Sequence, residues 1–313
     1  MNELISVIIP TYKRSETLER AIKSVMAQTY KNIEIIVVDD NAEYPEYRIR
    51  NKKMIEKYKD IIFIENKINL GGGLSRNEGI KKAKGAFLAF LDDDDEFLPE
   101  KIEKQYKYYL EINDKKAAMI YCYGNLIKMN GNKKEYKKNM EGNLLLENIE
   151  LCIAGTSYWF CPKKIIESVG GFEDISSKQD ASLLTKLFIK GYNVYCVPEI
   201  LINFYYHDEN NGITKINLKT ITAEKQYRKL FLELTENNKC IDEETRKSAL
   251  YLFSYRLSRW YIHLLDIKNA KIEYKKMKQI KHISKKNLQI FLGIYFNKLY
   301  NYLANIKHKI KVG

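Results

Sequence analysis

A run of acidic side chains ends an apolar segment early in the chain. Residues 86–99 read AFLAFLDDDDEFLP, so four consecutive aspartates follow a stretch with the composition of a buried strand. Carboxylates this close together repel one another. A hard divalent cation, Mg²⁺ or Mn²⁺, removes the conflict because it prefers oxygen ligands and keeps positions open for phosphates. The alternative is a solvated acidic turn, since aspartate also favours loops and helix starts.

The residues around this run alternate between strand and helix patterns. Helical spacing of apolar residues over 15–27 and a glycine-opened segment over 72–83 predict helices. Continuous apolar runs typical of strands buried on both faces lie at 5–10 and 33–40, and two further strands are expected at 61–65 and 86–91. The alternation predicts βαβ units and a parallel sheet, in which ligands bind beyond the carboxyl ends of the strands. We therefore expect the polar strand ends to meet at one crevice; they are residues 10–12, 39–41 and 92–95.

The rest of the chain has a different character. Residues 115–214 predict two strands around an Asn130-Gly131 turn, a short strand in GTSYWFCP, a helix after Gln179 and two further strands over 191–207. Residues 215–313 contain few glycines and many Lys, Leu, Tyr and Ile, which indicates helices. Together these patterns predict an α/β portion followed by an α-helical region.

The distribution of charge supports a boundary near residue 215. The chain of 313 residues has a formal net charge of +13. Residues 215–313 contain 22 Lys and Arg against 8 Asp and Glu, whereas residues 1–214 contain 31 against 32. The whole basic excess therefore lies in the last third, which is typical of a separate domain or an interaction surface.

The composition narrows the class of protein. It is 45% hydrophobic and 30% charged, as in globular proteins with a sizeable core. The five cysteines form no CxxC pair, which argues against a disulfide framework or a zinc site and suits a reducing compartment. The sequence shows neither a signal-peptide pattern nor eighteen successive apolar residues, so we expect a cytoplasmic protein.

Four motifs in order resemble the family-two glycosyltransferases, over residues 4–214. They read SVIIPTYKR, SVMAQTYKNIEIIVVDD, NLGGGLSRNEGIKKAKGAFLAFLDDDDEFLP and GGFEDISSKQDASLLTKL. The resemblance implies an α/β GT-A nucleotide-sugar fold, Rossmann-like, with a mixed, mainly parallel sheet between helices. It implies a catalytic domain over 1–214, with a nucleotide-sugar-binding half (1–114) and an acceptor-binding half (115–214). A basic α-helical region (215–313) then follows.

The resemblance also implies which residues bind the nucleotide sugar. Asp39 would accept a hydrogen bond from a uracil-type N–H, or it is a simple turn residue. Arg76 would meet the diphosphate with its paired donors, or it is an ordinary arginine on a helix surface. The other implied positions are Pro10, Thr11, Tyr12 and Arg14 at the first strand, with Asp92 and Asp93 in the acidic run.

A divalent cation, Mn²⁺ or Mg²⁺, is implied at the acidic run, which resembles a DxD motif. Asp92 and Asp94 would be its two members, with Asp94 as the direct ligand, although spacing cannot separate four equal aspartates. His207 resembles a late histidine of the family that would reach the metal or diphosphate; a structural role is the alternative.

Asp180 matches the position of the catalytic base. Many relatives have Glu-Asp there, whereas this chain has Gln179-Asp180. An ionised aspartate can take the proton of an attacking hydroxyl, and one base without a nucleophilic carboxylate implies inversion. The alternative, compatible with the first, is an N-cap of the next helix. Trp159 is expected either to line the acceptor site or to lie in the core.

The resemblance therefore implies an inverting, metal-dependent hexosyltransferase that uses a nucleotide sugar, a UDP-sugar above all. Its acceptor would be a glycan or lipid-linked glycan of a surface polysaccharide such as capsule. Residues 268–313 hold twelve lysines and one acid, and an amphipathic pattern over 287–306 predicts peripheral contact with an anionic membrane at its inner face. The alternative there is a helix packed on the catalytic domain. No nucleic-acid recognition motif is found. A non-catalytic scaffold that binds membrane or polyanion is the alternative function.

Overall fold

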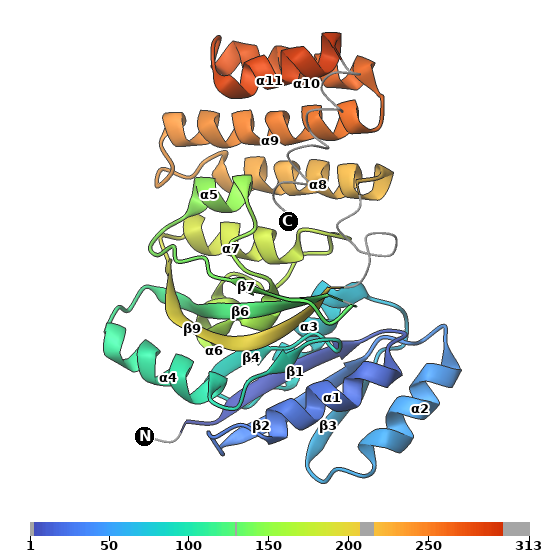
Figure 1. Cartoon of the computed structure of the whole chain (residues 1–313). Coiled ribbons are helices and arrows are strands. Elements are labelled where there is room, and N and C mark those ends of the chain that lie inside the picture. The colour runs from blue at the N-terminus through green and yellow to red at the C-terminus, as the bar shows by residue number, and fades with distance from the viewer. Residues whose placement is uncertain (1–2, 129, 207–215, 297–313) are drawn as a thin grey trace. The chain divides into compact units, whose positions relative to one another are not determined.

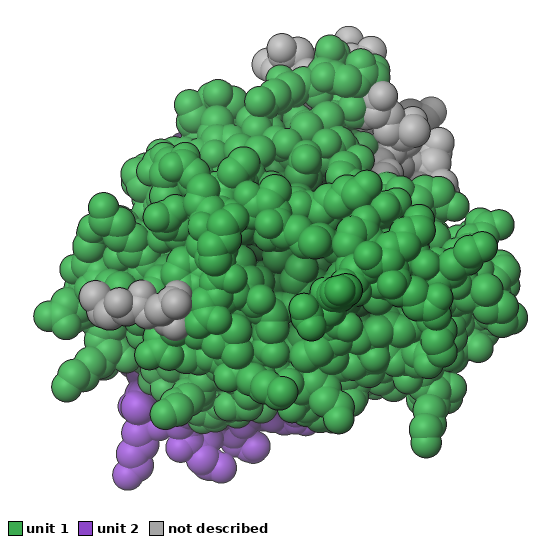
Figure 2. Space-filling model, turned by 90° about the horizontal axis from the view of Figure 1, so that it is seen from below, with its two compact units in different colours: residues 1–145, 152–175, 179–211 green, residues 146–151, 176–178, 212–313 purple. Residues whose placement is uncertain are grey.

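The computed structural model describes residues 3–128, 130–206 and 216–296. The chain forms two compact units, which are coloured separately in Figure 2. Unit 1 comprises residues 1–145, 152–175 and 179–211, and unit 2 comprises residues 146–151, 176–178 and 212–313. The boundary predicted after residue 214 falls within residues 207–215, outside the described part of the chain. Within the described residues, no helix has both the length and the apolar character needed to span a bilayer.

Unit 1 is built on one mixed sheet of nine strands (Figure 1). Its first four strands in sheet order are mutually parallel, as the alternation of strand and helix patterns predicts. The following strands join them through antiparallel pairs on both sides of β8. The sheet order is β3 (Ile61–Glu65), β2 (Ile33–Asp39), β1 (Ile5–Thr11), β4 (Phe87–Phe90), β8 (Phe160–Pro162), β6 (Ala117–Lys128), β9 (Asn193–Tyr206) and β5 (Glu96–Phe97), while β7 (Lys133–Tyr136) pairs with β6.

The central parallel strands are buried because helices cover the sheet, whereas β3, at its edge, has no buried residue. Every residue of β1 and β4 is buried, which explains their continuous apolar sequences. In α1 the apolar residues at helical spacing are also buried. The helices of this unit are α1 (Ser15–Met26), α2 (Pro45–Ile55), α3 (Gly71–Lys82), α4 (Lys101–Ile112), α6 (Lys163–Ser168) and α7 (Gln179–Ile189), with a 3₁₀ turn at Thr156–Tyr158.

The second half of the sheet differs from the expectation in one respect. The segment 191–207 was expected to give two strands, but one long strand, β9, runs from Asn193 to Tyr206 beside β6. Two irregularities in the register, near Cys122 and Tyr123, let the strand bend without breaking. The expectation of two strands is wrong because an internal bulge resembles a break in the sequence pattern.

Unit 2 is mainly helical, as predicted for the C-terminal region. It contains α8 (Leu218–Thr235), α9 (Glu243–His263), α10 (Ile267–Ile280) and α11 (Lys285–Tyr295), together with most of the short α5 (Leu145–Glu150). In Figure 1, α9 lies between α8 and the α10–α11 pair. Each of these four helices is preceded by an N-cap residue whose side chain accepts a backbone N–H of the first turn: Asn217, Asp242, Asp266 and Ser284.

Candidate active site

The four aspartates form a tight turn after β4. The backbone N–H of Asp95 donates to the carbonyl of Asp92 at 3.0 Å. As a result, carboxylate oxygens of Asp92, Asp94 and Asp95 lie within 4.8 Å of one another. An all-oxygen set of this size suits Mg²⁺ or Mn²⁺. The structure thus brings together the two predicted metal ligands, Asp92 and Asp94, and adds Asp95, which the sequence did not single out.

Two arginines neutralise part of this negative charge. Arg76 forms an ion pair with Asp92, and Arg14 forms one with Asp94. Arg14 also lies 3.2 Å from a carboxylate oxygen of Asp93. Both arginines were predicted to bind the nucleotide sugar, and both reach the turn where its phosphates would lie.

Burial changes the pKa values of Asp93 and Asp95. Burial raises the pKa of Asp93 to about 7, and the Arg14 guanidinium opposes this shift. Asp93 also accepts a hydrogen bond from the backbone N–H of Tyr12 at 3.3 Å, which ties the turn to the end of β1. Burial, with repulsion from Asp92 and Asp94, raises the pKa of Asp95 well above its usual range. Asp95 therefore retains a proton more readily than an exposed carboxyl group.

The end of β1 provides an aromatic surface next to the turn. Pro10 and Thr11 are buried, whereas Tyr12 is 36% exposed. Its ring meets that of Tyr44 edge to face, with 5.8 Å between the centroids, and the Lys13 ammonium lies 3.4 Å from the centroid of Tyr44. Of the three predicted residues, only Tyr12 offers substantial surface to a base. Tyr44, just before α2, was not predicted.

Asp39, the last residue of β2, is held by hydrogen bonds within its own surroundings. Its side chain is fully buried and already receives four hydrogen bonds. One oxygen accepts from the backbone N–H of Asn41 and from Arg48, and the other accepts from the side chains of Asn41 and Asn51, all at 2.8–3.0 Å. A carboxylate has about four acceptor positions, so none remains for a ligand. In this structure the Asp39 carboxylate holds the loop after β2 together, and its hydrogen bond to a base stays a prediction.

Asp40 is the neighbouring carboxylate with remaining capacity. One of its oxygens accepts from Asn66 and from the backbone N–H of Leu70, both at 2.8 Å. The other accepts from the backbone N–H of Gly71 at 2.8 Å. One acceptor position is left on this second oxygen. Asp40 thus links the end of β2 to the start of α3.

The glycines at the start of α3 allow two elements to approach closely. Gly71 has a φ of +76°, which favours glycine, and a Cβ on Gly73 would lie 3.1 Å from the side chain of Gln179. This approach lets Arg76 donate to Gln179 at 3.3 Å while it pairs with Asp92. Arg76 is 7% exposed, so it is not an arginine of the helix surface. The guanidinium therefore connects the acidic turn to the start of α7.

Asp180 lies in the first turn of α7, directly after Gln179. The helix begins at Gln179, so Asp180 is a residue of the helix and not its N-cap. One carboxylate oxygen accepts from the backbone N–H of Ala181 at 2.7 Å. The other lies 3.0 Å from the thiol sulfur of Cys152, a contact that the sequence did not indicate. Cys152 is exposed, so Asp180 lies beside an accessible side chain.

The family model for glycosyl transferase family 2 matches residues 6–170, which include the end of β1, the loop after β2, Arg76 and all four aspartates. The chain belongs to this family. It is 30% identical over 221 residues to an uncharacterised glycosyltransferase of Methanocaldococcus jannaschii, covering 68% of this chain and 74% of that protein.

This glycosyltransferase is also similar to two proteins with more specific names, one in sequence and one in structure. Over 103 residues it is 42% identical to WfaP of Escherichia coli, a UDP-Glc:α-D-GlcNAc-diphosphoundecaprenol β-1,3-glucosyltransferase, covering 33% of this chain and 40% of WfaP. A crystal structure of S. aureus TarS residues 1–349 with UDP aligns with a TM-score of 0.55 and 14% identity, covering 90% of this chain and 93% of that one. The predicted fold, a GT-A fold followed by a helical C-terminal region, is confirmed.

The two remaining predicted site residues are Trp159 and His207. Trp159 is fully buried, stacks on Phe172 with 6.1 Å between ring centroids, and donates to the carbonyl of Ala154 at 3.0 Å. It is a core residue, so the expectation that it lines an acceptor site is wrong. His207 lies outside the described residues.

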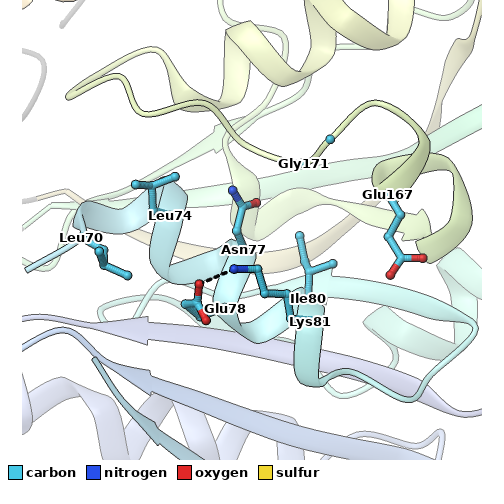
Figure 3. Close-up of a pocket in the computed structure, with 9 residues that line it drawn as sticks. Leu70, Leu74, Asn77, Glu78, Ile80, Lys81, Glu167 and Gly171 are labelled. Atoms are coloured by element: carbon cyan, nitrogen blue, oxygen red, sulfur yellow. Dashed lines mark hydrogen bonds and ion pairs between the residues drawn. The ribbon is translucent and has the colours of Figure 1, made fainter. Parts of the chain in front are cut away.

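A cavity of about 410 Å³ lies elsewhere, between α3 and the loop that follows α6 (Figure 3). Apolar side chains of α3 line it together with the Glu78–Lys81 ion pair, whose atoms lie 2.6 Å apart. None of the predicted site residues in the described part of the chain lines it, so the cavity does not coincide with the acidic turn.

Proposed function

We propose that this glycosyltransferase moves a hexose from a UDP-sugar to an acceptor hydroxyl with inversion at the anomeric carbon. The observation that carries the proposal is the position of Arg76, which contacts Asp92 in the acidic turn and Gln179 beside Asp180. One guanidinium thus connects the candidate diphosphate site with the candidate base. Such a connection suits direct displacement, since the attacking hydroxyl and the leaving diphosphate must flank the same carbon.

In this proposal the residues of the chain have separate roles. Asp180 accepts the proton of the attacking hydroxyl, and Arg76 and Arg14 bind the diphosphate with paired donors. Asp92, Asp94 and Asp95 would hold Mg²⁺ or Mn²⁺, which would supply positive charge for the leaving diphosphate. The close carboxylate oxygens of these residues support a metal of this class.

The proposal of a UDP-sugar donor rests on relatives and on two side chains. WfaP is named for a UDP-glucose reaction, and TarS has been crystallised with UDP and with UDP-GlcNAc. In this chain Tyr12 offers ring surface to a base, and Asp40, rather than Asp39, has an acceptor position left for an N–H of uracil.

We propose a lipid-linked glycan of a surface polysaccharide as the acceptor, because WfaP is named for an acceptor on diphosphoundecaprenol. The enzyme would then work as a peripheral protein at the inner face of the membrane. No nucleic-acid partner is proposed.

Calorimetry with UDP tests the metal and the donor together. We expect UDP to bind markedly more tightly with Mn²⁺ or Mg²⁺ than with excess EDTA, because the ion offsets the repulsion between the diphosphate and the acidic turn. Asp94→Asn should abolish transfer and remove most of this difference, whereas Glu100→Gln, an exposed neighbour, should change neither. Equal affinity of the intact protein for UDP with metal and with EDTA would overturn the metal assignment.

A further inference from the structure

The two last described helices present an unusual surface. Fifteen large apolar side chains are exposed in the described chain, and six of these lie within residues 272–296. They are Ile272, Ile283, Leu288, Phe291, Tyr295 and Phe296, with exposed fractions from 39% to 89%. Such a concentration in 25 residues is a feature of interaction sites rather than of ordinary surface.

Three of these six side chains share the outer face of α11, because its opposite face packs on α9. Asn287, Ile290 and Ile294 of α11 are buried, and the hydroxyl of Tyr251 in α9 donates to Asn287 at 2.8 Å. Leu288, Phe291 and Tyr295 follow one another at helical spacing on the outer side. Tyr255 of α9 donates to Gln289 at 2.6 Å and also fixes the rotation of α11.

A row of lysines on α10 runs beside this apolar row. The side chains at 271, 275 and 278 are exposed at helical spacing, while Ala270, Glu273 and Met277 are buried. The Lys271 ammonium lies 5.4 Å from the ring centroid of Tyr295, which places the two rows side by side. We name these six residues the outer face: Lys271, Lys275, Lys278, Leu288, Phe291 and Tyr295.

Most of the lysines around the outer face form no ion pair with an acidic side chain in the described part of the chain. Residues 268–296 contain eight lysines and one acid, Glu273, which is 4% exposed and pairs with Arg228 and Lys276. Among the described residues, six of these lysines are exposed and form no ion pair: Lys268, Lys271, Lys275, Lys278, Lys281 and Lys285. A partner for this surface must therefore be anionic and must also accept apolar side chains.

We propose that the outer face docks on an anionic lipid surface. Phe291, Leu288 and Tyr295 enter the boundary between head groups and acyl chains, while the three lysines contact lipid phosphates. The proposal rests on the proposed function in one respect, since it would hold the enzyme at a membrane that carries its acceptor. The proposal assigns the membrane contact to residues of α10 and α11, whose other sides are buried.

Flotation of the full chain with lipid vesicles tests the proposal. Vesicles of equal parts phosphatidylglycerol and phosphatidylcholine should bind the protein at low salt and release it at high salt, whereas pure phosphatidylcholine should bind little. Replacing Lys271, Lys275 and Lys278 together by Gln should weaken binding about a hundredfold, because each lysine near the surface contributes about fivefold. Leu288→Gln with Phe291→Gln should weaken it about tenfold or more.

Matched variants on α2, and at Lys57 just after it, provide the control. Replacing Lys52, Lys53 and Lys57 by Gln removes the same charge from exposed positions, and Ile49→Gln removes an apolar side chain that is 66% exposed. Neither should change vesicle binding by more than about twofold. Circular dichroism should show that all variants are folded.

Three outcomes would overturn the proposal. They are absence of binding to anionic vesicles at low salt, equal losses in the α2 and outer-face variants, and concentration-dependent self-association that Phe291→Gln abolishes. Asp94→Asn separates the two proposals, because it should lose transfer and still bind vesicles. An intact protein that binds vesicles but transfers no sugar would contradict only the proposed function.

Discussion

At the level of single residues, two adjacent aspartates differ in the hydrogen bonds that they receive, which their sequence does not show. Asp39 and Asp40 are chemically identical and both follow β2, yet four donors fill the first and three occupy the second. The donors come from α2, the loops after β2 and β3, and the start of α3, so the sequence alone cannot assign them. The same holds for the acidic run, in which Asp93 turns towards β1 and Asp95 towards Ser157.

Asp39→Asn should therefore act on stability before it acts on binding. An amide group would direct its own N–H towards at least one of the donors that now reach the carboxylate. We expect the free energy of unfolding in urea to fall by about 3 kcal/mol, because a buried charged network loses its acceptor. Asp174→Asn, at an exposed position, should cost less than about 0.5 kcal/mol. Equal stability of the two variants would contradict the proposed structural role.

A second single substitution, Asp180→Asn, tests the proposed catalytic base. Removal of a general base should lower turnover about a hundredfold or more, while UDP binding stays nearly unchanged, since Asp180 contacts Cys152 and its own helix but none of the four aspartates. Steady-state kinetics with calorimetry separate the two effects. Glu100→Gln, at an exposed position, is the control. Near wild-type transfer by Asp180→Asn would move the base elsewhere and make Asp174 the next candidate.

At the level of elements, apolar spacing predicts the amphipathic helices well and buried polar contacts poorly. The apolar face of α1 agrees with its sequence pattern. The start of α4 does not, because Lys101 and Gln105 are both fully buried there. Gln105 donates to the carbonyls of Ile120 and Tyr158 at 2.8 and 2.9 Å, and Lys101 donates to Gln105 at 2.7 Å. Such a helix is held to its strands by polar groups, which a periodicity of apolar residues cannot show.

Lys101 makes the attachment of α4 sensitive to pH. Burial lowers the pKa of Lys101 from 10.5 to about 8, so the charged form is favoured in the unfolded chain. Below pH 8 both states are charged and the folded state carries the cost of burial. As the pH rises from 8 towards 10.5, the folded state loses its proton first and becomes relatively more stable.

Urea unfolding of the wild type and of Lys101→Met measures this effect. Between pH 7.5 and 9.5 the wild type should gain about 2 kcal/mol relative to the variant, because groups shared by both proteins cancel. Lys107→Met, at an exposed position of the same helix, should show no such gain. A constant difference between wild type and Lys101→Met across this range would refute the assignment.

For the whole molecule, the sequence predicted the fold class because the evidence for it is local. Strand and helix periods, strand-end residues and the family motifs can each be recognised within a short segment. The sheet order is not local: β8 lies between β4 and β6, and β6 pairs with β9 across more than sixty intervening residues. Whether a residue such as Trp159 lies in the core depends on that order. The sequence alone therefore could not decide whether Trp159 is a core residue or lines the acceptor site.

The ion pair of Arg14 with Asp94 has a consequence for how the acidic turn meets an ion. Arg14 is a tethered counter-ion: it is 44% exposed along its side chain and reaches the turn from the residue just before α1. An incoming cation would compete with this arm, so its capture would be an exchange between two positive charges rather than a simple addition. Such competition lowers the apparent affinity below that of bare carboxylates, and each exchange would free a guanidinium next to the site proposed for the diphosphate.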